Sequence, residues 1–560
     1  MFASLGFLGS ITVSAILVLL LMNQSMYIKP SFSIYKIFYI NISWLLDSWS
    51  YLKLSDYNYL KVKLVLAIIG PTSLLFIIYS IFYKEIFSYK VVKEKESTFG
   101  DAHWATNQEI EKANLRAKQG MLLGVDDIGY YVADGFQHTL LFAPTGAGKG
   151  VGFVIPNLLF WTHSVFVHDI KLENHELTSG WRAKQGQQVF VWEPANPDGI
   201  THSYNPIDWV STKPGQRVDD VQKIANLIIT EKDFWNNEAR SLFLGVTLYL
   251  IADDTKQKSF GEVVRTLRSD DFVYTLAVAM DTMGGIMHPV GYMNIAAFLQ
   301  KADKERSGLV STLNSGLELW ANPLIDLATA SSDFNIQEFK RKPSTVYVGL
   351  TPDNIDRLQK LMRVFYQQAT EFLSRKLPNV KEEPYGVLFL MDEFPTLGKM
   401  EQFKAGIAYF RGYRVRLFLV VQDTQQLKGT YEEAGMNSFL SNSTYRITFA
   451  ANNVETANLI SQLCGNKTVE QESFSRKKML DFSSGGGGGV NVSNAQRALL
   501  LPQEVISLPR DEQIILIESF PPIRSKKIFY FKDKMFTSRL LPKTFVPTQD
   551  QTQKVNTSLQ

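Results

Sequence analysis

The sequence predicts an α/β protein with a mostly parallel sheet, an inserted all-α domain and an N-terminal two-helix transmembrane hairpin. Three observations carry this prediction. Short apolar runs of strand type alternate with helical segments on both sides of residues 214–330. Residues 214–330 themselves show helical periodicity and contain no good strand pattern. Residues 5–23 and 64–83 contain no charged side chain. Strands that alternate with helices are typical of a parallel sheet with helices on both faces.

Residues 1–98 are expected to form the hairpin, with spans at about 5–23 and 64–83, a periplasmic loop between them and a juxtamembrane linker. Each stretch has about the 20 apolar residues that a helix needs to cross a bilayer. A cleaved signal peptide is the alternative for the first stretch, but no positively charged segment precedes it. Lysines lie on both sides of the second stretch, so the positive-inside rule does not orient the pair.

The remainder of the chain is expected to form one large domain with an insertion. Residues 99–213 and 331–540 are assigned to a nucleotide-binding domain whose sheet is split in sequence by the all-α domain, residues 214–330. Residues 541–560 are polar and are expected to be disordered. The 58 basic and 55 acidic residues nearly balance, so any nucleic-acid site must be local. The single cysteine, Cys464, excludes an internal disulfide framework.

The stretch LFAPTGAGKG, residues 141–150, lies between an apolar strand and an apolar helix. This context predicts a phosphate-binding loop: glycines let backbone N–H groups face a phosphate, a lysine reaches the β and γ oxygens, and a helix begins there. The loop residues are Thr145, Gly146, Ala147, Gly148, Lys149 and Gly150. Ala143 stands in the usual first glycine position, and Gly150 stands where a hydroxyl ligand for magnesium is usual.

A second motif supports a nucleotide site. The strand-like run VLFLMDEF ends in Asp392 and Glu393, the arrangement in which the first acid orders Mg²⁺ and the second polarises the attacking water. Gln422 ends another strand, VRLFLVVQD, where motor ATPases of RecA type carry a residue that senses the γ-phosphate. Asp169, Lys171 and Glu173 follow a further strand and are expected near the same edge, with structural ion pairing as the alternative.

These motifs, in this order, resemble the coupling proteins of type IV secretion systems. The resemblance rests on FGDAHWAT, APTGAGKGVGFVIPNLL, VHDIKLENHELTSGWR, YNPI, LFLMDEFPTLGK, VVQDTQQL and LLLPQEVISLPRDEQIIL, and it covers about residues 99–531. It implies a RecA-like P-loop NTPase domain, an all-α domain and a homo-hexameric ring beneath a membrane stalk. Members of the family often carry glycine after the P-loop lysine, so Gly150 is not a departure from the family.

The resemblance also implies a function and a set of partners. The expected activity is an inner-membrane ATPase, using ATP and Mg²⁺, that couples relaxase-bound single-stranded DNA or protein effectors to the inner-membrane components of a secretion channel. It implies an arginine acting on a neighbouring subunit, and Arg411 matches best, with Arg414 and Arg416 as rivals and a solvated basic turn as the alternative. The all-α domain is the expected docking face for cargo.

Two other functions stay open. A chromosome-partition pump for double-stranded DNA would share the motor, but the C-terminal DNA-loading module expected of such a pump is not seen in the sequence. A docking receptor that binds ATP without turnover would not need Glu393. DNA-contact residues are not identified, since the basic and aromatic run IRSKKIFYFKDK, residues 523–534, also has the pattern of an amphipathic edge strand.

Overall fold

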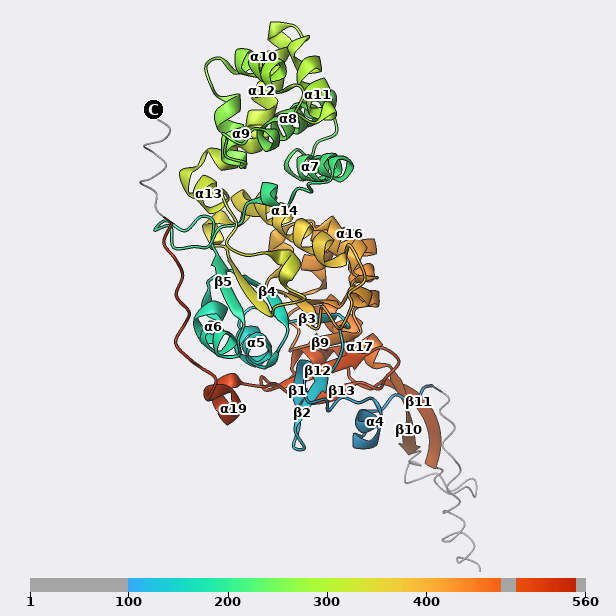
Figure 1. Ribbon diagram of the computed structural model, residues 1–560. Coiled ribbons are helices and arrows are strands. Elements are labelled where there is room, and N and C mark those ends of the chain that lie inside the picture. The colour runs from blue at the N-terminus through green and yellow to red at the C-terminus, as the bar shows by residue number, and fades with distance from the viewer. Residues whose placement is uncertain (1–98, 475–489, 550–560) are drawn as a thin grey trace, which may run out of the picture. The chain divides into compact units, whose positions relative to one another are not determined.

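The structure is a computed structural model that describes residues 99–474 and 490–549 (Figure 1). Both predicted membrane spans, at 5–23 and 64–83, therefore lie outside the described residues, as do residues 475–489, which include five consecutive glycines, and residues 550–560. Within the described ranges, no helix combines the length and the hydropathy needed to cross a membrane. The transmembrane hairpin stays a prediction.

The centre of the described part is an 11-stranded sheet with the order β2-β1-β13-β12-β9-β3-β8-β7-β4-β6-β5. The strands from β9 to β5 in this order run parallel, and those from β12 to β2 are antiparallel. The prediction of a mostly parallel α/β sheet is confirmed. The strands are β1 (Met121–Val125), β2 (Tyr130–Ala133), β3 (Thr139–Phe142), β4 (Ser164–Asp169), β5 (Gln188–Trp192), β6 (Ser344–Gly349), β7 (Val387–Met391), β8 (Val415–Val421), β9 (Tyr445–Thr448), β12 (Glu512–Ile517) and β13 (Ile523–Lys526). A separate antiparallel pair is formed by β10 (Asn466–Phe474) and β11 (Val490–Ala498).

Both faces of the parallel strands are buried, which explains why apolar residues in these strands are not confined to alternate positions. In β7, Val387, Phe389 and Met391 pack into one hydrophobic cluster. Leu388 and Leu390 point to the other face and pack into a second cluster. Helices on each side therefore sandwich the sheet and hold the strand ends in fixed positions.

The helices that pack around the sheet follow or precede its strands. They are α4 (Asn107–Lys112), α5 (Ile155–Phe160), α6 (Glu173–Lys184), α14 (Ile355–Ser374), α15 (Glu401–Gly406), α16 (Thr424–Asn442), α17 (Val454–Cys464), α18 (Pro502–Ile506) and α19 (Lys534–Thr537). Side-chain caps begin several of them; Asp423, for example, accepts a hydrogen bond from the backbone of Gln426 at the start of α16.

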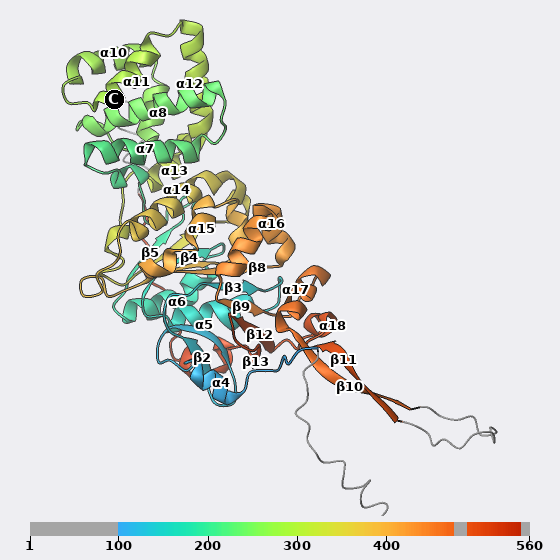
Figure 2. The same ribbon diagram turned by 90° about the vertical axis from the view of Figure 1, so that its right-hand side faces the viewer.

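Residues 214–328 form helices and no strand, and the helices group together in both views (Figures 1 and 2). They are α7 (Pro214–Ile228), α8 (Phe234–Ala252), α9 (Phe260–Leu267), α10 (Phe272–Met283), α11 (Pro289–Leu299), α12 (Asp303–Leu317) and α13 (Pro323–Ala328). The insertion falls between β5 and β6, which are neighbours in the sheet, so the chain leaves and re-enters the sheet at adjoining strands. The domain boundaries themselves stay a prediction.

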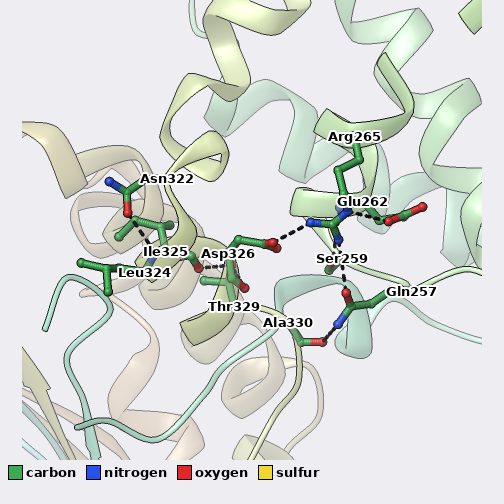
Figure 3. Close-up of polar contacts among 10 residues, drawn as sticks. All are labelled: Gln257, Ser259, Glu262, Arg265, Asn322, Leu324, Ile325, Asp326, Thr329 and Ala330. Atoms are coloured by element: carbon green, nitrogen blue, oxygen red, sulfur yellow. Dashed lines mark hydrogen bonds and ion pairs between the residues drawn. The ribbon is translucent and has the colours of Figure 1, made fainter. Parts of the chain in front are cut away.

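Polar contacts link α9 and the residues before it to the end of the helical insertion, near α13 (Figure 3). Arg265 of α9 binds Asp326 of α13 at 2.6 Å and Glu262 at 2.8 Å. Gln257 donates to the carbonyl oxygen of Ala330 at 3.3 Å. Gly261 is required beneath this network, because a Cβ there would lie 1.7 Å from a carboxylate oxygen of Asp326. The network fixes the end of the insertion against its own third helix.

Residues 541–549, the described part of the predicted tail, contact the rest of the chain. The backbone N–H of Thr544 donates to Ser179, and Gln549 pairs with Gly199 and Thr201. Leu541 and Pro542 pack on Gly180, where an added Cβ would lie 2.1 Å from a carbonyl oxygen. The backbone of this segment is thus held by α6 and by the edge of the sheet near β5, and the extent of the disordered tail stays a prediction.

Candidate functional site

Three loops with chemically active side chains meet at the carboxyl edge of the parallel strands. β3 leads into the glycine-rich loop, β7 into Asp392 and Glu393, and β8 into Gln422. β8 lies between β3 and β7, and all three are parallel. Since parallel strands end at the same edge of a sheet, the topology brings the three loops together. Ligands of open α/β sheets bind at this edge.

The glycine-rich loop has the backbone that phosphate binding requires. Gly146 and Gly148 have φ of +77° and +84°, conformations that a residue with a side chain rarely adopts. Added Cβ atoms at Gly146 and Gly150 would meet no atom within 4 Å, so the loop is open on that side. Thr145 is exposed at its tip. Gly150 begins a π-helical turn, Gly150–Val154, that leads into α5.

Lys149 lies between the two acids of the second motif. Its ammonium is 2.9 Å from Oδ1 of Asp392 and also pairs with Oε1 of Glu393. Gln422 donates from Nε2 to the other carboxylate oxygen of Glu393 at 3.2 Å. The structure therefore brings together Lys149, Asp392, Glu393 and Gln422, from three separate strand ends. A phosphate that entered the loop would compete with the two carboxylates for the Lys149 ammonium.

The backbone at Glu393 is unusual for a residue with a side chain. Its φ and ψ are 61° and 50°, in the left-handed region. Such conformations cost free energy and are concentrated at functional sites. Thr396 holds the turn by donating from its backbone N–H and its hydroxyl to the carbonyl oxygen of Glu393, at 3.0 and 2.7 Å. This turn directs the Glu393 carboxylate toward Lys149 and Gln422.

A further carboxylate, Asp169, lies at the end of β4, the strand beside β7. It accepts from the backbone N–H of His175 at 2.8 Å and from the Asn174 amide at 3.2 Å, and so anchors the first turn of α6. Burial raises the pKa of Asp169 to about 7, and the nearby charge of Asp392 adds to this rise. Burial also raises the pKa of Asp392, while the Lys149 ammonium opposes that rise. Three acidic side chains therefore lie at the ends of the neighbouring strands β4 and β7, and two of them, Asp392 and Glu393, contact Lys149.

Arg411 does not join this cluster. It lies in the short helix η8 (Phe410–Tyr413) before β8, whereas Gln422 follows the other end of the same strand. The length of β8 separates the two by roughly 20 Å. Arg411 is exposed, and among the described residues no hydrogen bond or ion pair involves its side chain. It therefore lies away from the glycine-rich loop of its own chain.

The two alternative arginines, Arg414 and Arg416, donate hydrogen bonds within the fold. Arg414 donates to the carbonyl oxygens of Glu383 and Pro384 at 3.0 and 2.7 Å. Arg416 is fully buried and donates to the carbonyl oxygen of Gly135 at 3.1 Å. Neither guanidinium is available on the surface in the way that Arg411 is.

Lys527 contacts the glycine-rich loop and was missed by the sequence analysis. Its ammonium donates to the carbonyl oxygen of Ala147 at 3.1 Å and lies 3.7 Å from the ring centroid of Phe449. Burial lowers the pKa of Lys527 to about 8. The only signal in the sequence was the basic and aromatic run at 523–534, which gave no indication of a partner 380 residues earlier.

Comparisons with known proteins identify the family of this chain. Residues 103–554 match the family described as Type IV secretory system Conjugative DNA transfer. Protein VirD4 of Rhizobium rhizogenes is 33% identical over 454 residues, which cover 78% of this chain and 66% of that protein. Conjugal transfer protein TraG of Escherichia coli is 28% identical over 505 residues, covering 80% of this chain and 79% of that protein. The chain spans just under two thirds of the length of the VirD4 relative.

Solved structures show the same fold. The bacterial conjugative coupling protein TrwBdeltaN70 has a TM-score of 0.57 at 14% identity, covering 81% of this chain and 96% of that chain. The plasmid coupling protein TrwB in complex with ADP and Mg²⁺ has a TM-score of 0.55 at 14% identity, covering 77% of this chain and 94% of that chain. At this identity the likeness concerns the fold alone.

Proposed function

This chain belongs to the type IV secretory system conjugative DNA transfer family, and we propose that it is an ATPase that couples cargo to a type IV secretion channel. The observation that carries the proposal is the convergence of Lys149, Asp392, Glu393 and Gln422 at one sheet edge. Family membership supplies the biological setting, and the site supplies the chemistry. A docking receptor without turnover would have no use for Glu393 beside Lys149.

The residues of the site fit ATP and Mg²⁺. The open loop from Thr145 to Gly150 would present backbone N–H groups to the phosphates, and the start of the following helix favours an anion there. Lys149 would bind the β and γ oxygens. Asp392 would hold Mg²⁺, which supplies positive charge beside the phosphates when bound and prefers to keep several of its waters. Asp392 could act through one of those waters, because Gly150 offers no hydroxyl.

Lys149 and Glu393 would change partners when nucleotide binds. In the structure the Lys149 ammonium is neutralised by the two carboxylates. Phosphate oxygens compete for the same ammonium, so nucleotide binding releases Glu393 from Lys149. The freed carboxylate, still held by Gln422, can accept a proton from a water that attacks the γ-phosphorus. Because Gln422 at the end of β8 contacts Glu393, a movement of Glu393 on nucleotide binding would also reach β8.

The assembly we propose is a homo-hexamer in which Arg411 acts on the neighbouring subunit. Its exposure and its distance from its own loop support this role. An arginine of this kind adds positive charge to the transferring phosphoryl group. The nucleotide-binding domain would consist of residues 99–213 and 331–540, and the helical residues 214–330 would bind cargo.

Residues 5–23 and 64–83 would anchor the chain in the bacterial inner membrane as two spans, with the ATPase domain in the cytoplasm. The partners would be inner-membrane components of the secretion channel, and a relaxase with its single-stranded DNA or protein effectors.

ATP hydrolysis by the purified full-length chain in detergent tests this function. We expect phosphate release that falls by at least about 10²-fold in Lys149→Ala. Single-stranded DNA should stimulate the wild-type rate if DNA is the cargo, and an effector segment should do so if protein is. Greater stimulation by double-stranded DNA would favour a chromosome-partition pump. Equal rates for wild type and Lys149→Ala would contradict the assignment of the site.

A further inference from the structure

Residues 527–532, between β13 and α19, lie against the glycine-rich loop. Lys527 donates to the carbonyl oxygen of Ala147 at 3.1 Å. An added Cβ at either Gly148 or Gly152 would lie 3.9 Å from Cε1 of Phe529. Gly148 and Gly152 are one helical turn apart, so the edge of the Phe529 ring packs beside the point where the loop becomes a helix. The distance of 3.9 Å corresponds to van der Waals contact with the ring edge at both positions.

Contacts on both sides of Phe529 fix its position. Before it, the buried Lys527 lies over the ring of Phe449 with 3.7 Å between ammonium and centroid. After it, the carboxylate of Asp533 accepts a hydrogen bond from the hydroxyl of Tyr130. Phe536 then packs edge-on against Tyr130 with 5.9 Å between ring centroids. The segment is thus tied to the first hairpin of the sheet, β1 and β2, and to the loop at the same time.

The aromatic rings here are partly exposed. Phe531 is 51% exposed and lies 5.7 Å from Phe529, and Phe529 itself is only partly buried. The ammonium of the exposed Lys532 lies 5.0 Å from the centroid of Phe529. Partly exposed aromatic rings next to a loop that would bind phosphates are suited to a ligand that has both an anionic and a flat aromatic part.

We propose that Phe529 stacks against the base of the nucleotide whose phosphates are bound by the glycine-rich loop. This inference rests on the proposed nucleotide site and extends it to base recognition. Stacking of a base on an aromatic side chain outweighs an exposed cation–π contact, so the base would displace the ammonium of Lys532 from the ring. The aromatic run therefore serves the chain's own nucleotide rather than transported DNA. We favour the chain's own nucleotide as the ligand because Phe529 lies beside Gly148 of the glycine-rich loop.

Comparing two ligands, one with a base and one without, distinguishes stacking of Phe529 on the base from a role of Phe529 in supporting the loop. The affinity of the full-length chain in detergent is measured by calorimetry for a non-hydrolysable ATP analogue and for inorganic triphosphate, which has no base. In Phe529→Ala we expect the analogue to bind about 5- to 150-fold more weakly, and triphosphate to bind as in wild type. Phe529→Tyr, which keeps a stacking ring, should restore the affinity for the analogue. Retained triphosphate binding also shows that the variant is folded.

The matched control is Phe545→Ala. Phe545 is 85% exposed and lies in the C-terminal segment along α6, so neither affinity should change. An equal loss of both ligands in Phe529→Ala would show that the ring only supports the loop, and unchanged binding of the analogue would likewise overturn the inference. If the wild-type chain bound neither ligand, the nucleotide site itself would be wrong, which is a different result from either of these.

Discussion

Replacement of Glu393 by glutamine is expected to slow ATP turnover and to tighten ATP binding at the same time. The change keeps the shape of the side chain but removes the charge that pairs with Lys149 and the group that would accept a proton. Gln422 can still contact the amide oxygen at this position. The two effects have opposite signs, because the carboxylate helps the reaction but competes with phosphate for the ammonium.

The magnitudes follow from the geometry. Loss of a positioned general base lowers turnover by about 10²- to 10⁴-fold. The side chains of Lys149 and Glu393 are 19% and 18% exposed, so solvent screens the pair only partly. A hydrogen bond to a charged group contributes about 1.5–3 kcal/mol, which corresponds to roughly 10- to 150-fold in affinity. Asp392 still holds Lys149 in the variant, so we expect the lower end, about tenfold tighter binding.

The assay pairs calorimetry of ATP binding with phosphate release under saturating ATP, on the full-length chain in detergent. Glu382→Gln is the matched control, since Glu382 is an exposed acid in the loop between α14 and β7. It should change neither quantity. Weaker ATP binding in Glu393→Gln would refute the competition between carboxylate and phosphate, and retained turnover would refute the role of Glu393 as the base.

Two further predictions concern Arg411 and Asp169. Arg411→Ala should bind ATP normally, but its turnover should fall by about 10³- to 10⁵-fold. Mixing Arg411→Ala chains with Lys149→Ala chains should recover part of the activity, because each variant keeps the group that the other lacks. No recovery in the mixture would contradict the action of Arg411 on a neighbouring subunit. The pKa of Asp169 is about 7 in the folded chain and about 3.9 in the unfolded chain. Its protonation therefore stabilises the fold fully below about pH 3.9, and this stabilisation is lost as the pH rises toward 7. Asp169→Asn lacks this titration, so its Tm relative to wild type should rise from pH 5 to pH 8, and a constant difference would argue against the raised pKa.

The sequence predicted the sheet well where strands are short, apolar and followed by glycine or acids. The strands β3, β7 and β8 are buried on both faces, so they are mostly apolar and stand out from the helices around them. The C-terminal end was harder to predict. The run at 523–534, which has the pattern of an edge strand, is a strand only from Ile523 to Lys526, and this strand lies inside the sheet between β1 and β12. The backbone of residues 541–549 is held by contacts with α6, which the sequence of this segment did not indicate.

The sequence by itself determined which residues end each strand, and therefore which chemical groups can reach the carboxyl edge of the sheet. It also determined the family, because the motifs occur in a characteristic order. Only the tertiary structure decided that β8 lies between β3 and β7, which places Gln422 on Glu393 and Lys149 between two acids. Only the tertiary structure placed Lys527 and Phe529 on the loop. The physical reason is that strand character is encoded by neighbouring residues, whereas contacts across 380 residues depend on how the whole chain buries its apolar surface.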